Sequence, residues 1–340
     1  MEKPASTGGI TSGERLKAPV FVLGCPRSGT TVLYHMLLSA GNFAVYRAES
    51  NVFSVLQPRF GDLRFESNRR ELLRYWLNSK LFQVSGLDAD ALRERVLRDC
   101  HGAGDFLRGV MEEIARSQRV ERWADCTPDH LLYIAEIKRE IPNALIVHII
   151  RDGRDVALSY AKQGWAHPFP WDRNQQLAVA SLYWEWIVKR GRAFGRRLGG
   201  DYCEVHYEDL VQNPRETLRG LSDFVGQELD YDRIQQIRIG SVSEPNSSFS
   251  AGAAGGDFRP VRRWAEQMSP EQLRICEALI GDLLRDLGYG KTTSGKSTLH
   301  DEWMRATYMP WFSARHFLKS RTFLGRLSAI ERMEISEDGN

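Results

Sequence analysis

The sequence predicts an α/β fold in three layers, with a central parallel sheet and helices on both faces. Short apolar runs that are typical of buried strands alternate along the chain with longer runs that have helical periodicity. The strand candidates are apolar at nearly every position instead of at every second one. Parallel strands that are covered on both faces show this pattern.

The first strand is expected at residues 20–23, where β-branched and aromatic residues are followed at once by glycine. Apolar residues then recur at helical spacing over 30–39. The second clear strand is 144–150, and a helix from about 152 to 162 follows it. Residues 202–206 are the third strand candidate. Further helices are expected at 68–82, 88–98, 104–118, 128–140 and 173–198.

We expect one main domain over residues 19–290. The chain has 340 residues, 42% of them hydrophobic and 26% charged, which is an ordinary composition for a globular protein. Residues 1–18 are rich in Gly, Ser, Thr and Pro and are predicted to be a flexible N-terminus. A polar stretch from Lys291 separates a C-terminal tail, 291–340, which is predicted to be helical.

Composition excludes several classes of function. The 46 basic and 44 acidic residues give a formal net charge of +2, which argues against nucleic-acid binding. No apolar run approaches the roughly 18 residues that a membrane-spanning helix needs, and residues 1–16 lack the apolar core of a secretory signal. These features predict a cytoplasmic protein. The five cysteines are far apart and form no CxxC pair, so neither a disulfide framework nor a metal site is expected.

Residues 24–31 form the clearest motif, with the sequence Gly-Cys-Pro-Arg-Ser-Gly-Thr-Thr. The motif lies where the first strand gives way to the first helix. Glycines allow a tight turn in which successive N–H groups point into one concavity, and the helix N-terminus adds partial positive charge. The motif therefore predicts an anion cradle and a P-loop-like fold.

The cradle differs from the loop of nucleoside triphosphatases, GxxxxGK[ST]. Gly24 and Gly29 have the required spacing and Thr31 fills the Ser/Thr position, but Thr30 replaces the lysine that reaches the β- and γ-phosphates. The positive charge lies within the loop instead, at Arg27, whose guanidinium can hold phosphate or sulfonate oxygens in a bidentate manner. The loop favours an anion other than a Mg-bound triphosphate, and a P-loop kinase or nucleoside triphosphatase is the alternative.

A second anion-binding motif follows the strand at 144–150. Arg151 stands at the carboxyl end of this strand, where open parallel sheets bind ligands. Ser159 comes eight residues later, about two turns along the next helix. A fixed cation and a hydroxyl are therefore expected to approach one anion from two sides.

The two motifs together resemble those of the sulfotransferases that use 3′-phosphoadenosine 5′-phosphosulfate (PAPS), in particular the bacterial and tyrosylprotein-type branch. The resemblance runs from about residue 19 to 290. It extends to residues 123–128, to the Tyr-Glu-Asp-Leu segment 207–210, and to the part that closes over the nucleotide, from Arg263 to Tyr289. The resemblance implies that the 5′-phosphosulfate is held by Arg27, Ser28, Gly29, Thr30 and Thr31. It implies that the rest of the nucleotide is held by Arg151, Ser159, Tyr207, Arg262 and Arg263.

The implied reaction moves a sulfonate group from PAPS to a hydroxyl or amine by in-line attack, releases adenosine 3′,5′-bisphosphate (PAP) and requires no metal. Arg27 would stabilise the charge that grows on the leaving phosphate. Glu49 resembles the catalytic glutamate of tyrosylprotein-type relatives and is the candidate base, with His130 as an alternative. Cys126 stands where relatives usually carry a lysine, so a catalytically degenerate nucleotide-binding module is also an alternative.

The sequence leaves the acceptor open among a carbohydrate, a lipid, a peptide tyrosine and a small metabolite. An aromatic loop at 164–171 is a candidate wall of the acceptor site. The tail over 301–330 combines basic and aromatic residues. Its apolar face is expected to pack on the domain or on a second copy of the chain, and contact with a membrane surface is the alternative.

Overall fold

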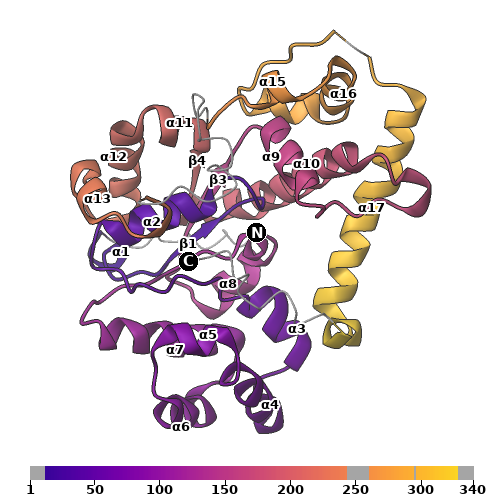
Figure 1. Ribbon diagram of the computed structural model, residues 1–340. Helices are drawn as coiled ribbons and strands as arrows, with labels where there is room; N and C mark the ends of the chain where they lie inside the picture. Colours follow the sequence, from indigo (N-terminus) through magenta and orange to yellow (C-terminus); the bar gives the residue numbers. More distant parts are fainter. Residues whose placement is uncertain (1–11, 243–259, 295, 328–340) are drawn as a thin grey trace, which may run out of the picture.

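The computed structural model describes residues 12–242, 260–294 and 296–327. Four parallel strands form the central sheet in the order β2-β1-β3-β4 (Figure 1). They are β1 (Val20–Leu23), β2 (Ala124–Asp125), β3 (Leu145–Ile150) and β4 (Tyr202–His206). The predicted fold class, a central parallel sheet between layers of helices, is confirmed.

Alternate residues of the strands contribute to two separate cores, because successive side chains of a strand point to opposite faces. Val20 and Val22 belong to one core, with α2, α12 and α13. Phe21 and Leu23 belong to the other and larger core, with α7, α10 and α16. All six residues of β3 are buried, which explains why its sequence is apolar throughout.

Most of the helices cover the face of the sheet that borders the larger core. Helices α2 and α11 to α13 cover the face that borders the smaller core (Figure 1). Helices of the first half are α1 (Ser12–Arg15), α2 (Thr30–Ser39), α3 (Gln57–Phe60), α4 (Glu66–Trp76), α5 (Lys80–Ser85), α6 (Ala89–Asp99), α7 (Ala103–Ser117), α8 (Ile134–Glu140) and α9 (Gly153–Lys162). Those of the second half are α10 (Gln176–Gly195), α11 (Tyr207–Gln212), α12 (Pro214–Val225), α13 (Tyr231–Ile237), α15 (Trp264–Gln267), α16 (Pro270–Asp286) and α17 (Leu299–Arg321). Shorter helical turns are η1 (Val52–Leu56), η2 (Pro128–Tyr133), η3 (Pro170–Asp172), η4 (Arg196–Asp201), η5 (Gly240–Val242) and η6 (Phe323–Leu327).

Two of the predicted helices are interrupted. The helix expected over 68–82 ends at Trp76 and a new one begins at Lys80, because Ser79 caps the second helix by accepting a hydrogen bond from the Phe82 N–H. The helix expected over 128–140 is a 3₁₀ turn, η2, followed by α8. The short strand β2 was not predicted.

The C-terminal helix α17 packs on the domain through Met304, Tyr308 and Phe312, which are buried against α10 and α16. At the other end of the chain, Arg15 of α1 donates a hydrogen bond to the carbonyl of Phe224 at 2.8 Å. Residues 1–11 of the predicted flexible N-terminus and residues 328–340 of the tail lie outside the described residues. None of the helices among the described residues is long and apolar enough to cross a membrane.

Candidate active site

The loop between β1 and α2 turns sharply at the end of the sheet. Arg27 and Gly29 both have left-handed backbone conformations, with φ of 75° and 94°. The N–H of Ser28 donates to the carbonyl of Cys25 at 3.0 Å, which closes the turn. Gly29 is the N-cap of α2 and supplies no side chain to cap it. The first N–H groups of α2 are therefore available to an anion.

The structure brings the two predicted anion motifs together. Nε of Arg27 donates a hydrogen bond to Oγ of Ser159 at 2.9 Å, and Nη1 of Arg151 donates to the carbonyl of Arg27 at 3.3 Å. Two polar atoms of this cluster are buried without a hydrogen-bond partner within the described part of the chain, namely Oγ of Ser28 and Nε of Arg151. Buried donors of this kind are normally satisfied, so the cluster fits an anionic ligand.

Positive charge dominates the cluster. Burial lowers the pKa of Arg27, and the charges of Arg151 and Arg263 lower it further. The Arg151 guanidinium lies 4.5 Å from the ring centre of Tyr207 and 3.4 Å from a carboxylate oxygen of Asp155. Because three guanidiniums lie within electrostatic range of one another here, the cluster is suited to a ligand with more than one negative charge.

A buried network of charged side chains next to Arg151 fixes the position of Trp264 and its neighbours in the chain. Arg154 pairs with Asp152 at 2.7 Å and with Glu277 at 2.6 Å, and its guanidinium lies 3.8 Å from the ring centre of Trp264. The indole N–H of Trp264 donates to Asp152 at 3.1 Å, and its backbone N–H donates to Asp155 at 2.8 Å. This network was not predicted from the sequence, since charged residues at a helix start are usually exposed.

The network determines where the two neighbouring arginines lie. Arg263 precedes Trp264 and lies close enough to Arg27 to lower the pKa of that guanidinium. Arg262 is exposed, and its guanidinium lies 6.0 Å from the ring centre of Trp264. The structure therefore brings Arg263 to the cluster, whereas the nucleotide contact of Arg262 stays a prediction.

Glu49 lies beside the start of α2. The residue keeps an exposed surface, but neighbouring protein removes part of its hydration. This burial, followed by the negative charges of Asp129 and Asp125, raises the pKa of Glu49 to about 8. A carboxylate with a raised pKa is the kind of group that acts as a general base near neutral pH.

Cys126 lies within electrostatic range of Glu49 and next to Thr30 and Thr31 of the anion cradle. Its thiol is buried beside the hydroxyls of Thr30 and Thr31, and burial followed by the charge of Glu49 raises the pKa of the thiol well above its usual value. A protonated, buried thiol is a poor nucleophile. Cys126 is therefore a small packing residue that joins the two parts of the site.

The other candidates are structural. Nδ1 of His130 lies 2.9 Å from Asp125, and its Nε2 accepts the N–H of Phe53 at 3.1 Å. Both ring nitrogens of this buried residue are thus engaged, which leaves neither free to accept an acceptor's proton. His148 is buried in β3 with its pKa lowered to about 3 by burial. Trp123 is buried against Phe21, with ring centres 5.8 Å apart.

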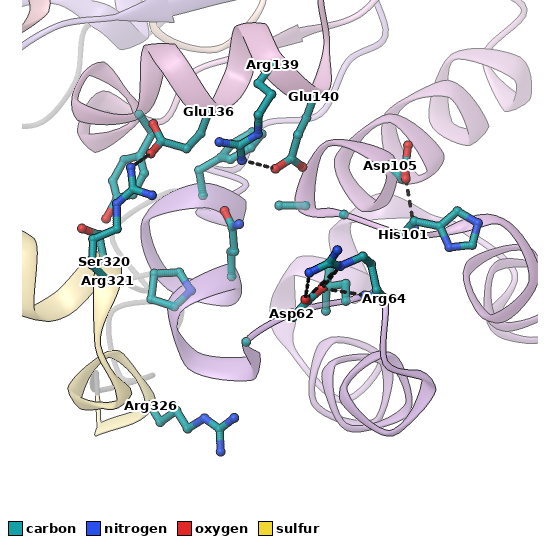
Figure 2. Close-up of a pocket in the computed structure, with 18 of the residues that line it drawn as sticks. Asp62, Arg64, His101, Asp105, Glu136, Arg139, Glu140, Ser320, Arg321 and Arg326 are labelled. Atoms are coloured by element: carbon teal, nitrogen blue, oxygen red, sulfur yellow. Dashed lines mark hydrogen bonds and ion pairs between the residues drawn. The ribbon is translucent and has the colours of Figure 1, made fainter.

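A wide groove of about 950 Å³ lies at the far end of α17, and several of its charged side chains pair with one another. Figure 2 shows Arg64 on Asp62, Arg139 on Glu140 and Arg321 on Glu136. Glu140 also accepts the N–H of Gly104 at 2.6 Å and so occupies the N-terminus of α7. No residue of the cradle lines this groove. The described residues contain no group of three or more His, Cys, Asp or Glu that could hold a metal ion.

Comparisons with known proteins agree with this geometry. The model of the sulfotransferase family matches residues 19–231. A protein of Aquifex aeolicus is 26% identical over 62% of this chain, which spans only about a quarter (26%) of that relative's length. A Caenorhabditis briggsae protein, provisionally named a protein-tyrosine sulfotransferase, is 22% identical over 81% of this chain and 90% of its own.

The same fold occurs in a solved structure, the sulfotransferase domain from the olefin synthase of Synechococcus PCC 7002. The two sequences are 18% identical, and the structures superpose with a TM-score of 0.52. The match covers 81% of this chain and 96% of the solved domain. The cradle lies inside the region that the family model matches, as do Arg151 and Ser159. The chain belongs to the sulfotransferase family.

Proposed function

We propose that the protein transfers a sulfonate group from PAPS to a hydroxyl or amine acceptor and releases PAP, without a metal ion. The observation that carries this proposal is the contact between Arg27 and Ser159, which joins the loop after β1 to the helix after β3 around buried, unpartnered donors. A nucleotide with phosphates at both its 5′ and 3′ positions supplies the several negative charges that this cluster lacks.

Residues of this chain would hold the donor in two groups. The N–H groups at the start of α2, with Ser28 and Thr31, would bind the 5′-phosphosulfate. Arg151 and Ser159 would bind the 3′-phosphate, and Arg263 would close over the nucleotide beside Arg27. The bound donor supplies an activated sulfonate whose leaving group is the 5′-phosphate of PAP.

Glu49 and Arg27 would carry out the transfer. The acceptor oxygen or nitrogen forms a bond to sulfur while the bond between sulfur and the phosphate oxygen breaks. Glu49 takes the proton that the acceptor loses. Arg27 and the N-terminus of α2 stabilise the negative charge that develops on the departing phosphate.

Two arginines would replace the lysine that relatives usually carry at the position of Cys126. Arg27 and Arg263 lie within electrostatic range of each other, so both can face the same phosphate oxygens. A guanidinium keeps its charge when buried and offers several donors to an oxyanion. This arrangement supports an active enzyme over a degenerate binding module.

The test is calorimetric titration of the full chain with PAP, and with Mg-ATP in parallel. We expect tight PAP binding and weak ATP binding, because the loop lacks the lysine that reaches a γ-phosphate. Tight ATP binding without PAP binding would overturn the donor and restore the kinase or triphosphatase alternative. PAP binding without transfer to any member of a broad acceptor panel would favour the degenerate module.

A further inference from the structure

A narrow cavity adjoins the anion cradle. Its walls come from η2, from the loop after α9, from α10 and from α17. Tyr160, which lines it, directly follows Ser159, and the ring centre of Trp165 lies 5.6 Å from the guanidinium of Arg27. One end of the cavity therefore borders the residues that would hold the transferable sulfonate.

The cavity also reaches a neighbour of the candidate base. Asp129 lines the cavity, and its charge contributes to the raised pKa of Glu49. A molecule in the cavity thus lies beside Trp165, whose ring adjoins Arg27, and beside Asp129, whose charge reaches Glu49. This is a position from which an acceptor can approach the cradle.

The walls are aromatic and packed on one another. Tyr160 stacks on Tyr183 with ring centres 5.2 Å apart, and Phe312 of α17 lies 5.5 Å from Tyr183 and 5.7 Å from Trp186. The cavity volume is about 110 Å³. A cavity of about 150 Å³ accommodates one benzene molecule, so this smaller space encloses at most one flat ring, excludes a branched saccharide and leaves the rest of an acceptor at the cavity rim.

The wall that α17 supplies is cationic. Arg315 and Lys319 line the cavity from α17, and Asp129 is the one carboxylate among its described lining residues. Arg305 and Arg321 of the same helix are each paired with a carboxylate, Glu185 and Glu136. Arg315 has no carboxylate partner among the described residues.

His316 lies between Arg315 and Lys319 in the sequence and also lines the cavity, but it carries no charge that would offset theirs. Burial lowers the pKa of His316 to about 4, and the neighbouring charges of Arg190 and Lys319 contribute to the shift. The ring is therefore neutral near pH 7. It packs against Tyr133, with ring centres 5.2 Å apart, and so serves as part of the wall.

We propose that this aromatic cavity selects a small acceptor with a flat apolar body, a reactive hydroxyl facing Arg27 and Glu49, and an anionic group facing Arg315 and Lys319. The inference rests on the proposed sulfonate transfer. It assigns acceptor specificity to α17, which begins after the residues that the family model matches.

The test compares two probes that differ in one charge, 3-(4-hydroxyphenyl)propionate and its neutral amide. Each is titrated by calorimetry into the full chain, with and without saturating PAP. We expect the carboxylate to bind about fivefold more tightly than the amide, the size of effect that an exposed ion pair gives. The double variant R315Q/K319Q should lose this preference while it binds the amide as before.

A matched control removes two exposed arginines elsewhere on the surface, R197Q/R219Q, and should keep the preference. Equal binding of the two probes, no binding of either, or a preference that survives in R315Q/K319Q would overturn the inference. The PAP titration is read separately. PAP binding without a carboxylate preference leaves the proposed function standing, and a carboxylate preference without PAP binding contradicts the proposed donor alone.

Discussion

The ring of Tyr207 occupies the space beside Gly29 that any larger side chain would need. A Cβ atom placed on Gly29 would lie 2.3 Å from Cδ2 of that ring. The same ring lies against the guanidinium of Arg151, 4.5 Å from the ring centre. The glycine of the first motif and the arginine of the second are thus held at a fixed separation by one aromatic ring.

Substitution of Gly29 by alanine is expected to weaken PAP binding by about tenfold or more, because the new methyl group displaces Tyr207 and with it Arg151. The left-handed backbone adds a strain of about 1–2 kcal/mol. Gly86→Ala is the control, since Gly86 has a φ of 66° and an open surrounding. Denaturant unfolding should show strain in both variants, and calorimetry should show lost affinity in Gly29→Ala only. Equal PAP affinity in the two would refute the role of the ring.

Alanine at Arg27 or at Arg151 should weaken PAP binding by about 1.5–3 kcal/mol, the range for a lost charge-assisted hydrogen bond. This corresponds to about 10- to 100-fold in affinity. Arg64→Ala is a suitable control, because Arg64 is exposed and pairs only locally with Asp62. Unchanged affinity in both cradle variants would remove the two arginines from the nucleotide site.

Glu49→Gln should retain PAP binding and lose turnover, because an amide cannot accept the acceptor's proton. With a pKa of about 8 for Glu49, turnover of the unmodified enzyme should rise with pH up to about 8 and then level off. Full turnover in Glu49→Gln would assign the base elsewhere.

The same substitution should change the pH dependence of stability. The pKa of Glu49 is about 8 in the folded chain against an ordinary 4.5, so the folded state binds the proton more tightly. The stability that this proton contributes is fully present below pH 4.5 and is lost as pH rises through about 8. Glu49→Gln should therefore gain in Tm over the unmodified protein on going from pH 5 to pH 9. The exposed control Glu216→Gln should show no such trend.

Trp264→Phe should destabilise the fold by about 0.5–1.5 kcal/mol, because it removes the indole hydrogen bond to Asp152, whose carboxylate keeps its contacts with Arg154. PAP binding should weaken less than in Arg151→Ala, since Trp264 acts by fixing Arg263. Trp303→Phe, at an exposed position of α17, should stay within about 0.5 kcal/mol of the unmodified protein. Denaturant unfolding measures the stability of both variants, and calorimetry measures PAP binding.

Cys126→Lys should move the pH–rate profile to lower pH, because an ammonium group beside Glu49 lowers the pKa of that carboxylate. Cys126→Met is the matched variant, with a side chain of comparable length and no charge, and should leave the profile in place. A profile that moves equally in both variants would trace the change to packing.

The fold was predictable where the sequence carries its own signal. The apolar run at 144–150 contains β3 because a strand buried on both faces must be apolar along its whole length. The two-residue strand β2 has no such signal: it is defined by its pairing with Val20 and Phe21 of β1. Ser79 likewise ends one helix and starts another through a cap that apolar periodicity does not register.

The site was predictable where its residues are neighbours in the sequence. The loop from Gly24 to Thr31 and the Arg151–Ser159 pair each show their chemistry in one short segment. The pKa of Glu49 depends instead on Asp125 and Asp129, which only the fold brings near it. The cavity beside the cradle depends on α17, more than 100 residues after Ser159, so no local pattern could place Arg315 at its wall.

Arg27, Arg151 and Arg263 repel one another, since like charges interact strongly where water is scarce. A polyanion bound among them would offset that repulsion and so stabilise the folded chain. Any ligand that binds only the native chain adds about 2.7 kcal/mol of stability at 100 times its Kd. The fraction of chains that are folded would then rise with the concentration of any polyanion that this cluster binds.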